Sequence, residues 1–534
     1  MAAMKTEVKE KSTTRPLGHM ECYQFHMLQL RFLGGTIVSC RYAIPTPLAT
    51  PDLHDHVVRQ VEDALARVVI EQPALRFVAV KADTKRPAWV AVDQLNFAHH
   101  VQWTDVSSDS ETDDDAGMVS QETLRARIER CLDESYAHEP KGPQWRVIIL
   151  FKSSGDPVLD IIFDYSHALG DGMSGKIFHE TLFRTLNTCA VTPSKTESMI
   201  APTLLSNHIL TIPPTAGTLQ PAIEKTGKFS VSAKYVASMA WQELRPPKLS
   251  SNSAALAHWA PIRATPYKTH FRTFDIEADV LRDVLAACRV HKTTITGLLH
   301  VVVLISMAAH IPAATAFTSD TPVDLRRHIE ADKIKRLDFD PRRTMANYVS
   351  TTWHKFGVDD VREIRAAKRS SNGEEEPALV ALVWRHAARV RAEIQKKLDL
   401  GLKNDINNLM GLVTDWRAQH RANAHKARLL SFVVTNLGVL DGEPASTTTQ
   451  TTEVEKEKEK KGQDDAAAEG WKITQSTFAI STEVLGAAFQ ISPITVRGGA
   501  LRVGCSWQDC VVERGLAETI ISDMERLLRF LAKS

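Results

Sequence analysis

The pattern in this chain that most directly suggests chemistry is a histidine followed four residues later by aspartate and glycine. It lies in "LDIIFDYSHALGDGMSGKIFHETLF" and consists of His167, Asp171 and Gly172. A neutral imidazole, with an unperturbed pKa of about 6.5, can take a proton from an alcohol or amine at neutral pH. Asp171 is close enough in sequence to fix the turn that carries the histidine. Gly172 leaves room where another group must approach closely.

The same stretch contains a second motif with a different meaning. Read from Gly170, GDGMSG matches the GxGxxG pattern of a dinucleotide-binding turn. That turn requires a following helix and then a second parallel strand. Here the helix leads into "TCAVTPSKTESM", which is too polar for a buried strand, and the preceding strand is the second arm of a predicted hairpin. We therefore favour the histidine interpretation over the dinucleotide one. A third interpretation is a buried structural histidine beside an Asp171 that caps a helix.

Length and composition indicate a multidomain globular protein. The 534 residues correspond to about two to four domains. The 65 basic and 64 acidic residues nearly cancel, so nothing in the charge favours nucleic acid as a partner. Seven scattered cysteines without zinc-type spacing indicate free thiols in a reducing compartment. The N-terminal segment lacks the apolar run of a signal peptide, so we expect a cytoplasmic protein.

Two further features bear on membranes and metals. The most apolar stretch, Thr293–Phe317, is interrupted by polar residues and a proline, so it predicts a buried helix and no integral membrane span. We expect at most a peripheral association with membranes. The histidines of His54–His56 and His99–His100 have no matching carboxylates or thiols nearby in sequence. They are interpreted as surface residues, and no metal site is expected.

Helices and strands are interspersed along the chain. A helix and then a strand are expected on either side of Pro73, and "WRVIILF" and "VLDIIFDY" predict a hairpin. A helix over "SGKIFHETLFRTL" follows. The second half predicts helices in "TTITGLLHVVVLISMAAH", near Leu379–Leu400 and at the C-terminus, with strands in "AFTSDTPVDLRR", "RLLSFVVTNLGVL" and around 478–490 and 499–507. Strands joined by short turns favour mixed or antiparallel sheets packed on helices.

Polar segments suggest how the chain is divided. We expect a disordered N-terminus over 1–14, an N-terminal subdomain over 15–190, a crossover linker over 191–225 and a C-terminal subdomain over 226–534. The segment 443–470 has almost no apolar residues and predicts a disordered insertion between two strands. Shorter polar stretches at 107–117 and 368–377 predict surface loops.

HALGDG resembles the HxxxDG active-site motif of CoA-dependent acyltransferases, which include chloramphenicol acetyltransferase, plant BAHD acyltransferases and the condensation domains of peptide synthetases. The chain is most similar to fungal alcohol acetyltransferases. The supporting segments, in order, are "RPLGHMECYQFHMLQLRFLGG", "QPALRF", "TPVDLRR", "MANYVS", "VVTNLG" and "GGALRVGCSW". The resemblance runs from about Arg15 to the C-terminus. Ser166 stands where many condensation domains have a second histidine, and "VTNLG" replaces the DFGWG segment of the plant enzymes.

The resemblance implies an α/β fold of the chloramphenicol acetyltransferase type. Two similar subdomains, each a mixed β-sheet with flanking helices, would meet around a central tunnel. Acetyl-CoA would enter from one face as a co-substrate and the acceptor from the other, with His167 between them. No bound cofactor and no metal are implied, and we expect a monomer.

The resemblance also implies roles for individual residues. His167 would be the general base, and Asp171 would point away from the substrate and pair with an arginine. Arg326 is the first candidate for that arginine and Arg76 the second. For Arg326, the alternative of an ordinary surface arginine stays equally open.

Gly172 would support the motif, and Thr435 or Asn436 would donate a hydrogen bond to the developing oxyanion. The implied function is O-acetylation of a small alcohol or a hydrophobic secondary metabolite. N-acetylation of an amine is the nearest alternative, because the same base serves both nucleophiles. A binding protein that kept the fold without turnover is a third possibility, against which the intact motif argues.

Overall fold

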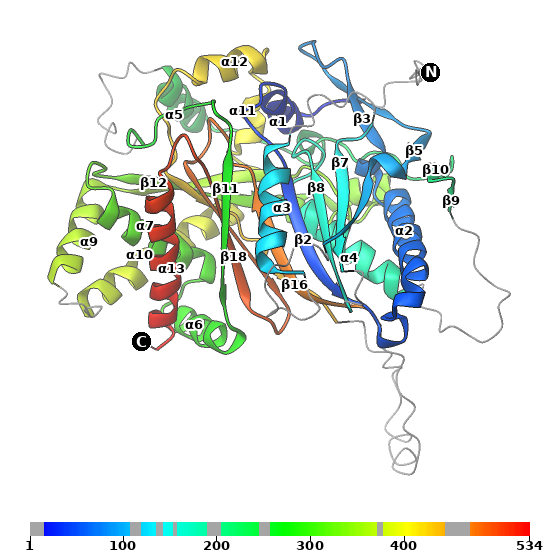
Figure 1. Ribbon diagram of the computed structural model, residues 1–534. Coiled ribbons are helices and arrows are strands. Elements are labelled where there is room, and N and C mark those ends of the chain that lie inside the picture. The colour runs from blue at the N-terminus through cyan, green and yellow to red at the C-terminus, as the bar shows by residue number, and fades with distance from the viewer. Residues whose placement is uncertain are drawn as a thin grey trace, which may run out of the picture.

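The computed structural model describes residues 15–106, 119–134, 142–152, 157–188, 204–244, 257–370, 377–443 and 470–533. Two β-sheets, each with helices packed against it, form the two halves of the molecule (Figure 1). This confirms the expected α/β class with mixed sheets. The segments 1–14, 107–117, 371–376 and 444–469, expected to be loops or disordered, lie outside the described residues.

The first sheet contains five strands in the order β16-β2-β8-β7-β6. Neighbouring strands are antiparallel except β6 and β7, and β7 and β8 form the predicted hairpin. The strands are β16 (Lys472–Ile480), β2 (Thr36–Ala43), β8 (Val158–Tyr165), β7 (Trp145–Phe151) and β6 (Val101–Asp105), and the helices that cover them are α2 (His54–Glu71), α3 (Gln121–Asp133) and α4 (Gly172–Thr188).

The alternation of side chains along β8 explains why helices cover both faces of this sheet. Ile161 and Phe163 are buried in the cluster that includes α2 and α4, whereas Ile162 is buried in the cluster that includes α3. Successive side chains of a strand point to opposite faces, so an uninterrupted apolar strand must be covered on both. β8 therefore carries the residues that follow it, including His167, into the interior.

The second sheet contains seven strands in the order β11-β18-β17-β14-β12-β13, with β15 paired to β17. It is mixed, because β14 is parallel to both β12 and β17. The strands are β11 (Thr269–Ile276), β18 (Leu501–Gln508), β17 (Phe489–Val496), β14 (Phe432–Val434), β12 (Phe317–Asp324), β13 (Val349–Phe356) and β15 (Val439–Leu440). Its helices are α6 (Ala278–Val290), α7 (Ile295–His310), α9 (Val358–Ser370), α10 (Pro377–Leu400) and α13 (Arg514–Leu531).

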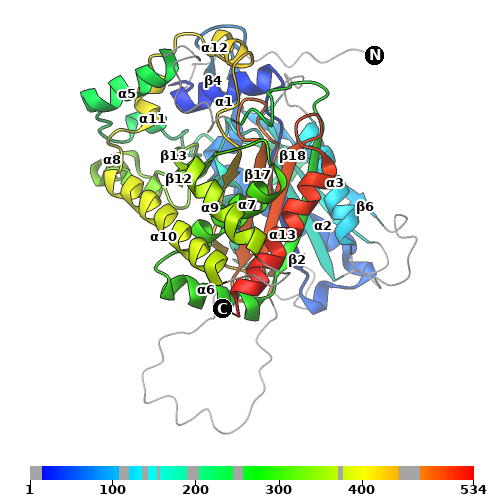
Figure 2. The same ribbon diagram turned by 90° about the vertical axis from the view of Figure 1, so that its left-hand side faces the viewer.

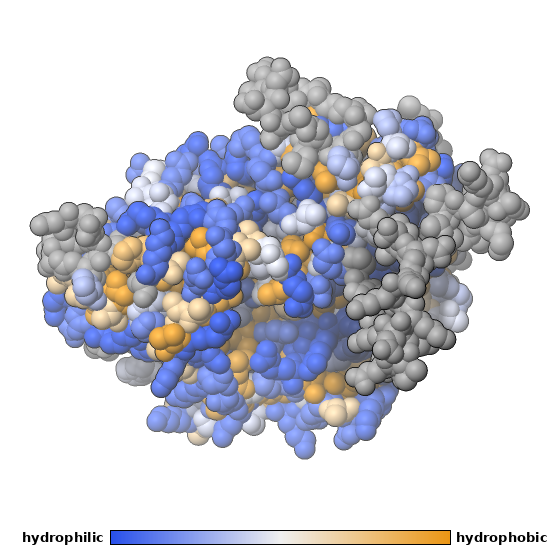
Figure 3. Space-filling model, turned by 90° about the horizontal axis from the view of Figure 1, so that it is seen from below, coloured by the Kyte–Doolittle hydropathy of each residue, from blue (hydrophilic) through white to orange (hydrophobic). Residues whose placement is uncertain are grey.

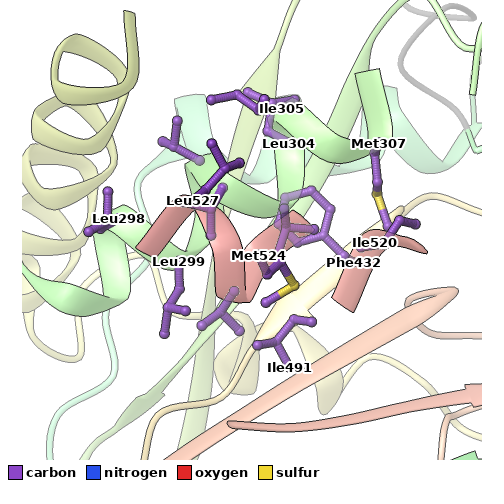
Figure 4. Close-up of a cluster of buried hydrophobic side chains, with 14 of the residues drawn as sticks. Leu298, Leu299, Leu304, Ile305, Met307, Phe432, Ile491, Ile520, Met524 and Leu527 are labelled. Atoms are coloured by element: carbon purple, nitrogen blue, oxygen red, sulfur yellow. The ribbon is translucent and has the colours of Figure 1, made fainter. Parts of the chain in front are cut away.

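Helix α7 lies at the centre of the larger hydrophobic core. In Figure 4 its apolar side chains meet Met524 and Leu527 of α13 and Phe432 and Ile491 of the sheet. This confirms that the apolar stretch at 293–317 contains a buried helix. In the described part of the chain no single helix is long and apolar enough to cross a membrane. The pair α6 and α7 passes that test only jointly and is bent by 96°.

The two halves exchange a strand, so they are not separate segments of the sequence. β16 pairs with β2 of the first sheet, although it lies within the expected C-terminal subdomain 226–534. The next strand, β17, returns to the second sheet. Part of the expected linker is also ordered, because β10 (Ile209–Thr211) pairs with β5 (Gln94–Asn96). Because the consecutive strands β16 and β17 belong to different sheets, the chain links the two halves here.

Smaller elements complete the fold, and several of them lie together at the top of the view in Figure 2. β1 pairs with β4 and β4 with β3, and β9 pairs with β10. The remaining elements are β1 (Arg15–Pro16), α1 (His19–Gln29), β3 (Phe77–Val80), β4 (Ala88–Ala91), β9 (Leu205–Ser206), α5 (Ala233–Leu244), α8 (Ala331–Leu337), α11 (Ile406–Met410) and α12 (Trp416–Asn423).

Candidate active site

His167 lies in the tight turn between β8 and α4. The turn begins where the Ser166 amide donates to the Gln144 carbonyl at 2.9 Å and the Leu169 amide donates to the Ser166 carbonyl at 2.9 Å. The His167 carbonyl accepts a hydrogen bond from Nδ2 of Asn347 at 2.9 Å. The histidine is therefore held through its backbone, which leaves its ring available for chemistry.

The surroundings of His167 favour a neutral ring. Burial lowers the pKa of His167, and the backbone at His167 and Gly170 and the carboxylate of Asp171 oppose this shift without reversing it. Its Nδ1 is buried and has no partner of good hydrogen-bond geometry among the described residues. A neutral imidazole with an unused nitrogen is the form that a general base requires.

The expected ion pair between Asp171 and Arg326 is present. Arg326 Nη1 lies 2.6 Å from Asp171 Oδ2, and Nη2 lies 3.0 Å from Oδ1. Both residues are almost fully buried, at 2% exposure for Asp171 and 3% for Arg326. Burial acts to lower the pKa of Arg326, but the carboxylates of Asp171 and Asp324 outweigh it and raise that pKa. This bidentate pair settles the open alternative against a surface arginine.

Asp171 has more than one partner, and this explains its rigidity. Its Oδ1 accepts from the amide of Ser174 at 3.0 Å, which caps the first turn of α4. Its Oδ2 accepts from the amide of Tyr348 at 2.9 Å. The Tyr165 hydroxyl donates to the Asp171 carbonyl at 2.7 Å. The aspartate is thus a helix cap and an ion-pair partner at once, and it ties the turn to both halves.

The second arginine candidate, Arg76, contacts a different part of the chain. Arg76 Nη2 donates to the carbonyl of Gly217 at 2.7 Å. Burial lowers the pKa of Arg76 to about 10. Arg76 thus anchors the backbone near residue 217, and Arg326 is the arginine that pairs with the motif.

The glycines of GDGMSG are needed for close packing. A Cβ at Gly172 would lie 2.9 Å from Leu437 Cδ2 and 3.1 Å from Phe478 Cζ. A Cβ at Gly170 would lie 2.6 Å from Ser174 Cβ, and one at Gly175 would lie 2.4 Å from a methyl group of Val38. The strand before the motif, β8, has antiparallel neighbours on both sides. A dinucleotide-binding turn requires a parallel neighbour, so the structure excludes that interpretation.

The two candidate oxyanion donors differ in their surroundings. Both polar atoms of the Asn436 side chain have hydrogen-bond partners, because its Nδ2 donates to Thr296 Oγ1 at 3.0 Å and its Oδ1 accepts from the Gly438 amide at 2.7 Å. Thr435 is buried, and its Oγ1 has no partner among the described residues. The contact of Leu437 with Gly172 brings this segment against the motif. Of the two, only Thr435 therefore has a side-chain donor without another partner among the described residues.

Sequence reasoning missed several residues that hold the site. Asn347 Nδ2 contacts both the His167 carbonyl and Gln24 Oε1 of α1. Ser174 Oγ donates to the carbonyl of Ala346 at 2.9 Å. Asn347 belongs to "MANYVS", whose similarity to acyltransferases is visible in the sequence, but nothing in that similarity assigns the asparagine its contact.

A pair of carboxyl groups between the halves was also missed. Asp320 of β12 and Glu483, in the loop between β16 and β17, are half-buried. Burial raises the pKa of each to about 7, and the proximity of Glu483 adds to the shift at Asp320. Thr351 Oγ1 donates to Asp320, and the Tyr23 hydroxyl lies 3.5 Å from Glu483. In the described part of the chain neither carboxyl has a basic partner at ion-pair distance.

The described residues contain no cluster of three or more histidine, cysteine or acidic side chains that could hold a metal ion. The predicted surface histidine His100 is buried instead, and its Nδ1 lies 2.9 Å from the carbonyl of Trp145. It stacks on the indole of Trp145, which explains why it leaves the surface.

Comparison with known proteins shows a similarity to alcohol acetyltransferases. The model of the alcohol acetyltransferase family matches residues 123–352, which include His167, Asp171 and Arg326. A probable alcohol acetyltransferase of Fusarium pseudograminearum, FCK4, is 24% identical over 475 residues, which cover 88% of this chain and 85% of the relative. Over the region that carries the motif, the chain is therefore similar to alcohol acetyltransferases. A second probable alcohol acetyltransferase, crmB of Aspergillus fumigatus, is 26% identical over 71% of this chain and 70% of the relative.

Solved structures agree on the fold of this protein. TRI3 trichothecene 15-O-acetyltransferase from Fusarium sporotrichioides superposes with a TM-score of 0.67 at 12% identity, over 97% of this chain and 95% of TRI3. The condensation domain of the monacolin K polyketide synthase MokA gives a TM-score of 0.56 at 11% identity, with 97% of both chains covered. The fold is that of the chloramphenicol acetyltransferase type, and the protein is an acyltransferase.

Proposed function

We propose that this protein transfers an acetyl group from acetyl-CoA to the hydroxyl group of an alcohol, with His167 as the general base. The observation that carries the proposal is the neutral, backbone-held His167 beside the buried Asp171–Arg326 pair. Such a ring can accept a proton at neutral pH, and a rigid turn keeps it in position. The acceptor is a small alcohol or a hydrophobic secondary metabolite.

The reaction requires one proton to move twice. His167 takes the proton of the acceptor hydroxyl while the oxygen forms a bond to the thioester carbonyl carbon of acetyl-CoA. The oxyanion of the tetrahedral intermediate receives a hydrogen bond from Thr435, whose Oγ1 has no other partner in the described residues. When the carbon–sulfur bond breaks, the imidazolium returns the proton to the leaving thiolate. The products are an acetate ester and free CoA, and no acyl-enzyme forms.

The Asp320–Glu483 pair favours N-acetylation as the second candidate. Two half-buried carboxyl groups without a basic partner would attract an ammonium group. Because the pKa of each lies at about 7, both carry negative charge in part at neutral pH and could hold a cationic acceptor. The same His167 would then serve as the base. An acceptor with several hydroxyl groups would satisfy the same carboxyls by hydrogen bonds, so the pair does not exclude O-acetylation.

The test is release of free CoA thiol by the purified full-length chain with acetyl-CoA and a panel of alcohols and amines. His167→Ala should lower the rate by about 10²- to 10⁴-fold. His208→Ala, at an exposed histidine in the turn between β9 and β10, is the matched control and should leave the rate unchanged. An unimpaired His167→Ala enzyme would refute the mechanism. Binding of acetyl-CoA without turnover over the whole panel would favour a non-catalytic protein of this fold.

A further inference from the structure

Helix α5 exposes an apolar stripe to solvent. Ala233, Val236, Ala237, Ala240 and Trp241 recur at intervals of three and four residues, which place them on one side of a helix. All five are exposed, with Val236 at 37% and Trp241 at 61%. Helices of globular proteins normally turn such a stripe towards the core, so the orientation of α5 is the reverse of the usual one.

The inner side of α5 shows that this orientation is specified. Among residues 233–241, whose side chains the structure describes, only Tyr235 and Met239, four residues apart, are half-buried against the protein. The start of the helix is fixed by Ser232, whose amide donates to Asn404 Oδ1 at 2.8 Å. Asn404 in turn donates its amide to the Ser230 carbonyl at 2.7 Å. α5 is thus attached along a narrow line, and its wide apolar side faces outward.

Positive charge surrounds the stripe. Lys225, Lys228, Lys234 and Lys403 lie on α5 or on the segments that join it to the protein, and all are exposed. Within the described residues none of them has an acidic side chain at ion-pair distance. Two carboxylates on these segments have other partners: Glu224 lies 3.8 Å from His19, and the buried Asp405 lies 2.5 Å from Lys397. A tryptophan and small apolar residues flanked by unpaired lysines match the surface of an anionic bilayer.

The position of α5 permits such a contact. In both ribbon views it lies at the upper left of the molecule, beside α11 and below α12 (Figures 1 and 2). The opposite face, seen from below in Figure 3, is mainly hydrophilic, with apolar residues scattered over it. A flat bilayer can therefore meet α5 without contact with the lower face.

We propose that α5 docks the protein on anionic phospholipid membranes, with Val236 and Trp241 inserted at the headgroup level and the four lysines over the negative lipids. A bilayer also dissolves apolar alcohols, so docking would concentrate such acceptors near the enzyme. Of these statements, only the one about acceptors rests on the proposed function. The docking itself needs no turnover.

The test is co-flotation of the full-length chain with vesicles of phosphatidylcholine and phosphatidylserine in a ratio of about 3:1, and with vesicles of phosphatidylcholine alone. Binding is expected only to the anionic vesicles and should weaken as salt is added. Trp241→Glu should lower the bound fraction about tenfold or more, and Lys228→Glu with Lys234→Glu should lower it to a similar extent. Val290→Glu is the matched control. Val290 is 75% exposed at the end of α6, on the opposite side of the molecule, and its replacement should have no effect.

Several outcomes would overturn the proposal. Equal binding of the wild-type and Trp241→Glu chains would exclude α5 as the docking element. Absence of binding to either vesicle type, with a concentration-dependent dimer that Trp241→Glu dissociates in sedimentation, would assign the stripe to a second copy of the chain. Absence of both binding and dimerisation would leave α5 without a docking role. CoA release with a water-soluble acceptor should be the same for all variants, which separates this test from that of the proposed function.

Discussion

Arg326 holds Asp171 with both terminal nitrogens, at 2.6 and 3.0 Å, across 155 residues of sequence. The same guanidinium contacts the carbonyl of Ala346 at 2.8 Å, so one side chain joins the histidine turn, the end of β12 and the segment before β13. The pair belongs to the scaffold of the site. It fixes the turn that carries His167.

Replacement of Arg326 should therefore act mainly by lowering the stability of the fold around the site. Arg326→Ala leaves the carboxylate of Asp171 buried without its cation, and the free energy of unfolding should fall by about 3–5 kcal/mol. Arg326→Lys keeps the charge but loses the bidentate geometry, so it should recover only part of that loss. Urea unfolding measures both effects. Arg327→Ala is the control, since Arg327 is the exposed neighbour. Equal stability of the Arg326→Ala and Arg327→Ala chains would contradict this account.

The pH dependence of the rate should report the environment of His167. Because burial lowers the pKa of this histidine below its ordinary value of 6.5, the base stays neutral and active at mildly acidic pH. The acidic limb of kcat/KM should have its midpoint below pH 6.5, measured by CoA release between about pH 5 and 8. Circular dichroism over the same range separates titration from unfolding. A midpoint at or above neutrality would contradict a desolvated base.

Gly172 should tolerate no side chain without adjustment of its neighbours. A methyl group there would meet Leu437 at 2.9 Å and Phe478 at 3.1 Å, and overpacking of this kind costs about 1–3 kcal/mol. Gly172→Ala should lower both stability and CoA release, and Leu437→Ala in the same chain should relieve part of the clash. Gly515→Ala is the matched control, because its Cβ would have no neighbour nearer than 3.7 Å. If both alanine variants melt at the same temperature, the proposed contact is wrong.

The carboxyl pair should make stability depend on pH in a definite direction. Burial raises the pKa of Asp320 and of Glu483 to about 7, from ordinary values of 3.8 and 4.5. A raised folded pKa stabilises the protein at low pH, and that contribution is lost as the pH rises towards about 7. The double variant Asp320→Asn with Glu483→Gln should therefore gain unfolding free energy over the wild type at pH 8 compared with pH 5. The expected difference is on the order of 1–2 kcal/mol.

Thermal unfolding of the wild-type and doubly substituted chains at both pH values measures this difference. Asp359→Asn is the control, because its side chain is 86% exposed on α9. The same pH dependence in wild-type and double-variant chains would show that the two carboxyls do not titrate as a buried pair.

The local parts of the site follow from the sequence because neighbouring residues carry them. The apolar run of β8 and the helical spacing in α4 place His167 at a strand–helix turn, and Asp171 is close enough to cap that helix. The resemblance in HALGDG and the later segments then indicates both the fold and the family. Most of the major strands and helices, including buried α7, are predictable on the same grounds.

Only the tertiary structure decided which distant groups meet. The resemblance left Arg326 and Arg76 open as partners of Asp171, and in the folded chain Arg326 is the arginine that contacts it. In the folded chain Asn436 donates to Thr296, whereas the Thr435 hydroxyl has no partner among the described residues, although the two residues are adjacent in the chain. The pairing of β16 with the first sheet and the outward apolar stripe of α5 are likewise decided by the tertiary structure. Strand pairing and helix orientation depend on surfaces formed by remote segments, and periodicity within one segment does not contain that information.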